Sequence, residues 1–172
     1  MNIRKIKTLG QLKAAGWQSR TIKDELRENL IEKLRKKEPL FTGIHGFEES
    51  VIPDLQRAIL SRHNIILLGL RGQAKTRIAR LVTELLDEHI PTVAGSDLND
   101  DPLNPVSFYA KKLIEEKGDE TPIVWLHRDE RYTEKLATPD VSVADLIGDV
   151  DPIKAANLKL PYSDERVIHF GL

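Results

Sequence analysis

A short apolar run that leads into a glycine-bearing loop constrains this chain more than any other feature. Residues 64–76 read NIILLGLRGQAKT. The run at 65–68 is apolar without alternation, which is typical of a strand buried on both faces of a parallel sheet. After the loop, apolar residues recur at intervals of three and four, which predicts an amphipathic helix: Ile78, Leu81, Val82, Leu85 and Leu86. This order of strand, loop and helix predicts an α/β fold with a parallel sheet flanked by helices.

The loop follows the phosphate-binding pattern G-x-x-x-x-G-K-[ST], except that Ala74 stands before the lysine. Backbone N–H groups at a helix N-terminus suit phosphate, Lys75 would reach the β- and γ-phosphates, and Thr76 would be a Mg²⁺ ligand. Ala74 is tolerated at negative φ and is penalised at positive φ. The alternative is an ordinary glycine turn with Lys75 on the surface. The predicted binding segment comprises Gly69, Gly72, Gln73, Ala74, Lys75, Thr76 and Arg77.

Composition and charge narrow the class of protein. The 172 residues are 40% hydrophobic and 31% charged, as in ordinary globular proteins, and the absence of cysteine excludes disulfides and thiolate zinc sites. No apolar run exceeds six residues, so we expect a cytoplasmic protein without a membrane span. Residues 1–37 carry 11 Lys and Arg against 4 Asp and Glu. A solvated helix face explains this excess more simply than binding to nucleic acid, which stays an alternative.

Local signals predict further elements along the chain. We expect helices at 8–15, from Thr21 to the proline at 39, at 51–60 and at 105–116, and strands at 90–94 and 122–126. A capping box begins at Ser142, Asp151 precedes a proline at a helix start, and 166–170 alternates like the first arm of a hairpin. The five histidines show no metal-binding spacing, which favours packing or surface positions over metal ligation.

The loop GLRGQAKT is similar to the G-x-x-G-x-A-K-T form found in MoxR-type AAA+ ATPases. The segments GIHGFEESVIPDLQRAIL, WLHRDERY and EKLATPDVSVADLIGDVDPIKAA resemble the N-terminal part of the magnesium chelatase ATPase-subunit group. The resemblance implies an incomplete P-loop NTPase (AAA+) parallel sheet at 41–172, the first half of the nucleotide domain, preceded by a basic helical extension at 1–40. It also implies ATP and Mg²⁺ as cofactors, with adenine contacts from Gly43, Ile44 and His45.

A Walker B strand is an apolar run that ends in Asp-Glu, and the sequence contains no clear example of one. The acids at 87–88 lie on the helix that follows the loop and cannot reach the phosphates. Asp129 and Glu130 follow a predicted strand, but two residues intervene, and a surface charge cluster is the more natural explanation. The resemblance places the Walker B strand, the sensor residues, the arginine finger and the lid beyond Leu172. We therefore expect this chain to bind nucleotide without hydrolysing it alone.

The resemblance implies that the complete protein is an ATP-driven homo-oligomeric ring, a hexamer, that remodels a protein client or drives metal insertion with chelatase-type partner subunits. Two alternatives remain: a non-hydrolysing nucleotide-binding or assembly module, and a nucleic-acid remodelling ATPase that uses residues 1–37. An unfinished parallel sheet exposes an edge, which predicts marginal stability or self-association.

Overall fold

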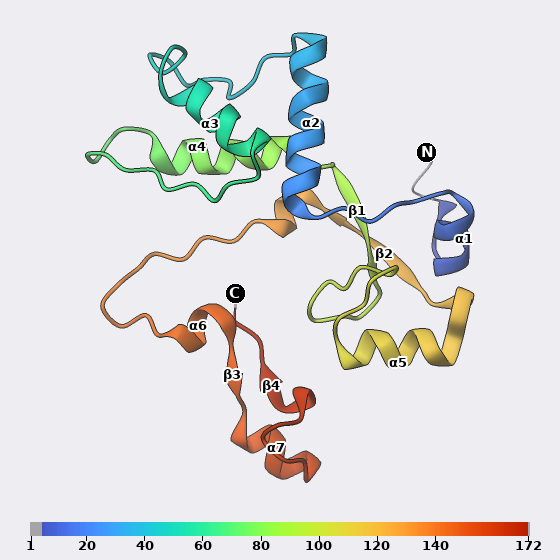
Figure 1. The fold of residues 1–172 in the computed structure, drawn as a ribbon. Helices are drawn as coiled ribbons and strands as arrows, with labels where there is room; N and C mark the ends of the chain where they lie inside the picture. Colours follow the sequence, from blue (N-terminus) through green and yellow to red (C-terminus); the bar gives the residue numbers. More distant parts are fainter. Residues whose placement is uncertain (1–4, 172) are drawn as a thin grey trace. The chain divides into compact units, whose positions relative to one another are not determined.

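The computed structural model describes residues 5–171, which form short helices and strands connected by long loops (Figure 1). The helices are α1 (Leu9–Ala14), α2 (Ile22–Lys36), α3 (Val51–Leu60), α4 (Lys75–Val82), α5 (Phe108–Lys117), α6 (Val143–Ile147) and α7 (Pro152–Leu158). The strands are β1 (His89–Val93), β2 (Ile123–His127), β3 (Asp149–Val150) and β4 (Ile168–His169). The fold is therefore α/β, as predicted. None of the described helices combines the length and the apolar character that crossing a bilayer requires.

The chain packs into two compact units. The first, which we call the loop unit, comprises residues 18–90 and 127–132 and contains α2, α3 and α4. The second unit, which we call the strand unit, comprises, among the described residues, 5–17, 91–126 and 133–171. The division predicted from the sequence, 1–40 and 41–172, concerns the extent of the ATPase-like segment and stays a prediction.

Most helices begin where the sequence predicts because their first residues supply the cap. The hydroxyl of Thr8 accepts a hydrogen bond from the backbone of α1, and the hydroxyl of Thr21 does so for α2. Ser142 forms a reciprocal capping box at α6, and the Asp151 carboxylate accepts from two N–H groups of α7. These contacts involve residues two or three positions apart, so the local sequence specifies them.

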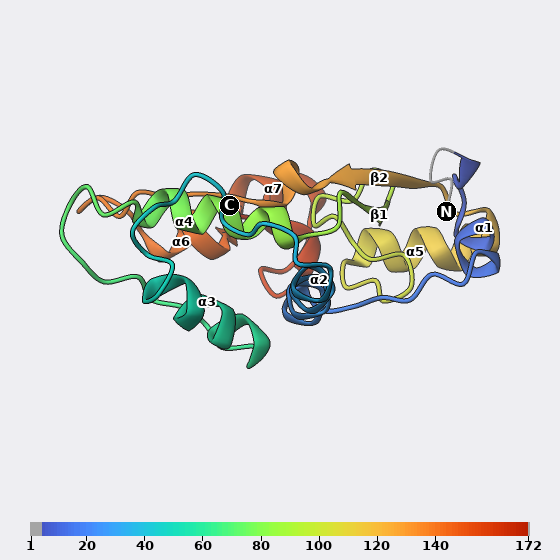
Figure 2. The same cartoon turned by 90° about the horizontal axis from the view of Figure 1, so that it is seen from above.

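The core of the loop unit lies where α2, α3 and α4 meet, and the three helices lie together in both views (Figure 1, Figure 2). Its buried members are Leu30, Phe41, Ile44, Leu55, Ile59, Ile78 and Leu85. Leu30 in α2 is fully buried, whereas Ile22 and Leu34 near the ends of the same helix are exposed. The apolar side chains of α2 are therefore buried along the middle of the helix and not at its ends.

A buried ion pair ties segment 127–132 to α2 within the loop unit. The Glu25 carboxylate accepts hydrogen bonds from Nη1 and Nη2 of Arg131 at 2.7 and 2.6 Å, and from the backbone N–H of Asp87 at 2.7 Å. Both side chains of the pair are buried. A planar guanidinium that binds a carboxylate through two parallel hydrogen bonds fixes its position closely.

The strand unit has its own small core around β2. Ile6, Leu12 and Ile123 are buried there, and Trp17 packs edge-on against Trp125 with ring centroids 5.6 Å apart. The indole N–H of Trp125 donates to the carbonyl of residue 6 at 2.9 Å, so this partly buried side chain has a partner for its polar group.

Asp100 organises the loop between β1 and α5. Its Oδ1 accepts from the N–H groups of Val106 and Ser107 at 2.6 and 2.9 Å, and its Oδ2 accepts from the Ser96 hydroxyl. Burial acts to raise the pKa of Asp100, but hydrogen bonds from Ser107, Ser96 and the backbone of Val106 together hold that pKa below its ordinary value. The carboxylate therefore stabilises the strand unit in its charged form.

Both sheets are antiparallel, so the predicted parallel sheet is absent from residues 5–171. The N–H of Ala94 donates to Pro122 O, and the N–H of Arg128 donates to Glu88 O, each at 3.0 Å, which sets β1 antiparallel to β2. In the second sheet Val150 pairs with Ile168. The segment predicted as the first arm of a hairpin is thus the second, returning strand.

The prediction of a buried strand at 65–68 is wrong for this structure. These residues form no strand, and Ile66 and Leu68 are 82% and 88% exposed. A continuous apolar run becomes a buried strand only when neighbouring strands offer backbone partners. Here β1 and β2 pair with each other. The helix after the loop is also shorter than predicted, because α4 ends at Val82 and a 3₁₀ turn, Thr83–Leu85, follows.

Candidate functional site

The glycine loop at 69–74 leaves the apolar segment and runs directly into α4, which begins at Lys75. Gly72 has φ +83° and Gly69 has φ +154°, and both values disfavour other residues. A Cβ placed on Gly69 would collide with the side-chain oxygen of Gln73, so this side chain lies directly over the loop backbone. The positive φ therefore favours glycine at both positions, and Gly69 in addition lies close to the Gln73 side chain.

Ala74 adopts φ +52° and ψ +17°, in the left-handed region, at the position before α4. The sequence prediction that Ala74 is tolerated without penalty requires a negative φ, so that condition is not met. For an L-residue with a Cβ the left-handed conformation costs about 1–2 kcal/mol. Its carbonyl still accepts the first helical hydrogen bond, from the N–H of Ile78 at 2.9 Å. Ala74 is thus a strained helix start at the position where the general motif has glycine.

The ammonium group of Lys75 folds back onto its own loop. Its Nζ donates to the carbonyl oxygens of Gly69 at 2.9 Å and Leu70 at 2.5 Å. The side chain is half-buried, whereas the neighbouring Thr76 is exposed to solvent. This arrangement holds a positive charge at the loop. An anionic ligand would have to offer better acceptors than these two carbonyl groups.

A cavity of about 470 Å³ lies beside the loop, between α3, segment 64–68 and the start of α4. Its polar lining comes from Asp54, Asn64, Gln73 and Lys75. Its apolar lining comes from Phe47, Val51, Leu55, Ala58, Ile65, Ile66, Leu67, Leu68 and Ile78. The volume falls within the range of about 300–1,000 Å³ that is usual for small-molecule sites. Apolar walls with a single ammonium group suit a ligand that joins a flat apolar part to an anion.

The predicted adenine-contacting segment lies outside this cavity. Ile44 is buried in the core of the loop unit, and neither it nor His45 lines the cavity. The side chain of His45 is exposed, and its Nδ1 lies 3.9 Å from Oε1 of Glu48. Gly43 has φ +76°, and a Cβ there would collide with the guanidinium of Arg77. The structure thus places Arg77 against Gly43. Of the predicted site residues, only Gln73 and Lys75 line the cavity; Ile44, His45, Gly69, Gly72, Ala74, Thr76 and Arg77 do not.

The acids that follow β2 have partners of their own. They lie in a 3₁₀ turn, Arg128–Arg131, where Glu130 accepts a hydrogen bond from the N–H of His127 at 3.3 Å. The N–H of Asp129 donates to Nδ1 of the same histidine at 3.3 Å. Neither Asp129 nor Glu130 lines the cavity beside the loop. The Glu130 carboxylate and the backbone N–H of Asp129 thus take part in the cap of this turn.

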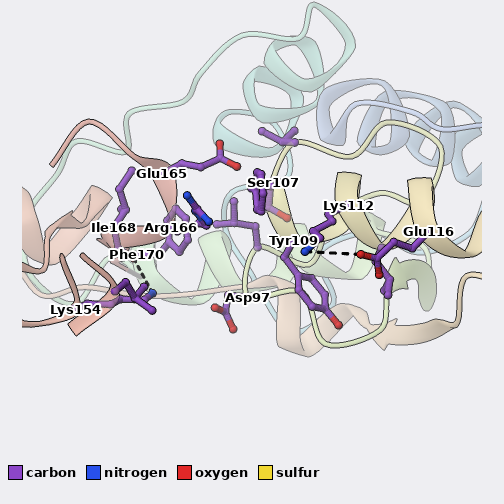
Figure 3. A pocket seen from close by; sticks show the side chains of 15 residues that line it. Asp97, Ser107, Tyr109, Lys112, Glu116, Lys154, Glu165, Arg166, Ile168 and Phe170 are labelled. Atoms are coloured by element: carbon purple, nitrogen blue, oxygen red, sulfur yellow. Dashed lines mark hydrogen bonds and ion pairs between the residues drawn. The ribbon is translucent and has the colours of Figure 1, made fainter. Parts of the chain in front are cut away.

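A second cavity, of about 690 Å³, lies within the strand unit between α5 and segment 154–170 (Figure 3). Its walls are largely apolar, and the Arg166 guanidinium lies 4.9 Å from the centre of the Phe108 ring. The Nζ of Lys112 lies 3.7 Å from Oε1 of Glu116, and the Nζ of Lys154 donates to the backbone carbonyl of Ile168 at 3.5 Å. Its cations thus have partners within the chain. No motif in the sequence indicates this cavity.

Comparisons with protein-family models, with curated proteins and with solved structures each found no match for this chain. The resemblance to MoxR and magnesium chelatase ATPases therefore rests on the loop and on the segments around it. The geometry beside the loop has to support the function independently.

Proposed function

We propose that this chain is the ATP-binding portion of an AAA+ ATPase of the magnesium chelatase and MoxR type. One observation carries the proposal: Gln73 of the glycine loop and Lys75 directly after it line a cavity of nucleotide-compatible size within one compact unit. The loop carries the sequence GLRGQAKT, which resembles a phosphate-binding motif, and its Lys75 lies at the cavity wall.

Nucleotide binding would use the charge and the backbone of the loop together. The phosphates would replace the carbonyls of Gly69 and Leu70 as partners of the Lys75 ammonium. The N–H groups at the start of α4 would add hydrogen bonds, because they have no partners within the helix and the helix dipole favours an anion there. The exposed Thr76 hydroxyl would bind Mg²⁺ together with phosphate oxygens. The apolar side chains of α3 would then border the base.

The complete protein, on this proposal, assembles as a homo-oligomeric ring, a hexamer, and couples ATP hydrolysis to remodelling of a client or to metal insertion with chelatase-type partner subunits. This part of the proposal is supported by the resemblance alone. Binding of nucleic acid by the basic residues near the N-terminus is the weaker alternative. Two of these residues form ion pairs within the chain, Arg20 with Glu28 and Lys36 with Glu32.

A second candidate function is nucleotide binding or assembly without turnover. It is supported by the positions of Asp129 and Glu130, which are engaged with His127 and lie outside the lining of the cavity. Hydrolysis needs a carboxylate that holds Mg²⁺ or orients water at the phosphates. We therefore expect the 172-residue chain to bind ATP and to release no phosphate.

Binding is tested by fluorescence anisotropy with an ATP analogue that carries a fluorophore on its ribose. Lys75→Ala should weaken binding about 10- to 100-fold, since a hydrogen bond to a charged group contributes about 1.5–3 kcal/mol. Lys23→Ala is the matched control, because Lys23 is an exposed lysine in α2 of the same unit. Equal affinity of the wild type and Lys75→Ala would contradict the proposal.

Hydrolysis is tested by phosphate release from Mg²⁺-ATP. We expect no release above a protein-free blank. Release that disappears in Asp129→Asn would show that this carboxylate is a Walker B residue and would overturn the second candidate.

A further inference from the structure

Three metal-ligating side chains meet where β1 begins and β2 ends. They are Glu88, His89 and His127, and one ligand atom from each lies within 4.8 Å of the others. The antiparallel register causes this, because His89 opens β1 and His127 closes β2. Their imidazole rings are 5.1 Å apart between centroids, at an angle of 70°. All three residues belong to the loop unit.

The exposure of these side chains leaves room for an ion. The side chains of His89 and His127 are 30% and 36% exposed, so both rings are partly covered by the protein and partly accessible to solvent. Glu88 is mostly exposed and can swing toward both rings. Ligand atoms around a tetrahedral Zn²⁺ at about 2.0–2.2 Å lie roughly 3.3–3.6 Å apart, so small side-chain rotations close the site.

Asp129 is placed to orient one of the two rings. Its Oδ2 lies 3.3 Å from Nδ1 of His127. Without metal, that nitrogen accepts the N–H of Asp129 at 3.3 Å. In a metal complex, Nδ1–H would instead donate to the Asp129 carboxylate, which leaves Nε2 of His127 free to coordinate. A carboxylate behind a metal-bound histidine fixes the tautomer and the ring orientation.

The neighbouring charged groups do not compete for this role. Asp87, next along the chain, is bound by Arg20 and by the Asn29 amide. Arg131, at the end of the same turn as Asp129, is bound to Glu25. The Glu130 carboxylate accepts the backbone N–H of His127, so Glu88 is the carboxylate of the cluster that is available to complete the set.

We propose that Glu88, His89 and His127 bind one divalent transition-metal ion, with Zn²⁺ as the best fit and Asp129 as a positioning residue. Two imidazoles and one carboxylate favour Zn²⁺ over Mg²⁺, which prefers oxygen ligands, so this site is separate from the Mg²⁺ that accompanies a nucleotide. Three protein ligands leave the fourth position for water or another ligand. The ion would clamp the start of β1 to the end of β2. The two histidines are 38 residues apart in the chain, so no local sequence pattern indicates this site.

The test is titration of the metal-free 172-residue chain with Zn²⁺ by isothermal calorimetry. We expect one site in the wild type and at least about tenfold weaker binding in His89→Gln and in His127→Gln, since each loses a metal ligand. His63→Gln is the matched control, because His63 is an exposed histidine of the same unit outside the cluster. Lys75→Ala should keep Zn²⁺ binding, which separates this proposal from nucleotide binding.

Two further measurements keep the test independent of folding. Co²⁺ should give a visible absorption band that is lost in both glutamine variants, and circular dichroism should show that each variant stays folded. Asp129→Asn should weaken Zn²⁺ binding by about 10-fold while leaving one site, as expected for an orienting group. No binding by the wild type at 1 mM Zn²⁺, or equal binding by wild type and both folded glutamine variants, would overturn the proposal.

Discussion

Replacing Ala74 with glycine is the sharpest test of the loop geometry. In the structure Ala74 has φ +52°, which glycine adopts without a steric penalty. If Ala74 instead had an ordinary negative φ, glycine would only add flexibility and remove a methyl group. The stability change therefore distinguishes a positive φ from a negative one.

The magnitude follows from three contributions. Relief of the left-handed strain favours the variant by about 1–2 kcal/mol. The greater freedom of unfolded glycine opposes it by about 0.5–1 kcal/mol. Ala74 is half-buried against the core of the loop unit, and loss of its methyl opposes the variant by about another 0.4 kcal/mol. The expected net effect lies between about 0.4 kcal/mol of destabilisation and about 1 kcal/mol of stabilisation, whereas a negative φ gives about 0.9–1.4 kcal/mol of destabilisation.

Hydrogen exchange measured residue by residue is the suitable assay. Both tryptophans, Trp17 and Trp125, belong to the strand unit, so their fluorescence does not report on the loop unit. The amide of Ile78 does, because it donates to the carbonyl of Ala74. Its exchange should be slower, or at most about twofold faster, in Ala74→Gly. In Ala79→Gly, a matched change inside α4, exchange should be about two- to fivefold faster. Exchange fivefold or more faster in Ala74→Gly would refute the left-handed assignment.

Two further predictions concern buried charge. Arg131→Ala leaves the buried Glu25 carboxylate without its guanidinium and should lower the unfolding free energy of the loop unit by about 3–5 kcal/mol, measured by urea dependence of amide exchange. A change below 1 kcal/mol would contradict the buried pair. Because the folded pKa of Asp100 is lowered, its stabilising contribution is present above the unfolded pKa and is lost as pH falls through the folded pKa. Acid unfolding followed by Trp125 fluorescence should therefore show a smaller loss of stability below pH 4 in Asp100→Asn, and an equal loss would count against this role.

The starts of the helices were predictable because capping is local. Thr21 and Ser142 accept hydrogen bonds from backbone groups three residues ahead, so a few letters of sequence determine them. The loop at 69–76 and its entry into a helix at Lys75 were predictable because the motif is one contiguous run of residues. Its φ at Ala74 was not, because backbone direction at one residue depends on how the segments before and after it pack.

The pairing of distant segments could not be predicted from the sequence. The apolar run at 65–68 predicts a buried strand, yet its burial depends on partners that the run itself does not specify. The pairing of His89 with His127, and of Glu25 with Arg131, joins residues far apart in the chain. No periodicity connects such positions.

The sequence by itself determined the helix starts, the α/β composition and the phosphate-loop motif with Lys75 and Thr76. Only the tertiary structure decided the antiparallel pairing of the strands, the cavity beside the loop and the cluster around His127. The physical reason is range: caps and turns are settled by hydrogen bonds across two to four residues, whereas strand register and side-chain clusters depend on which distant segments come together.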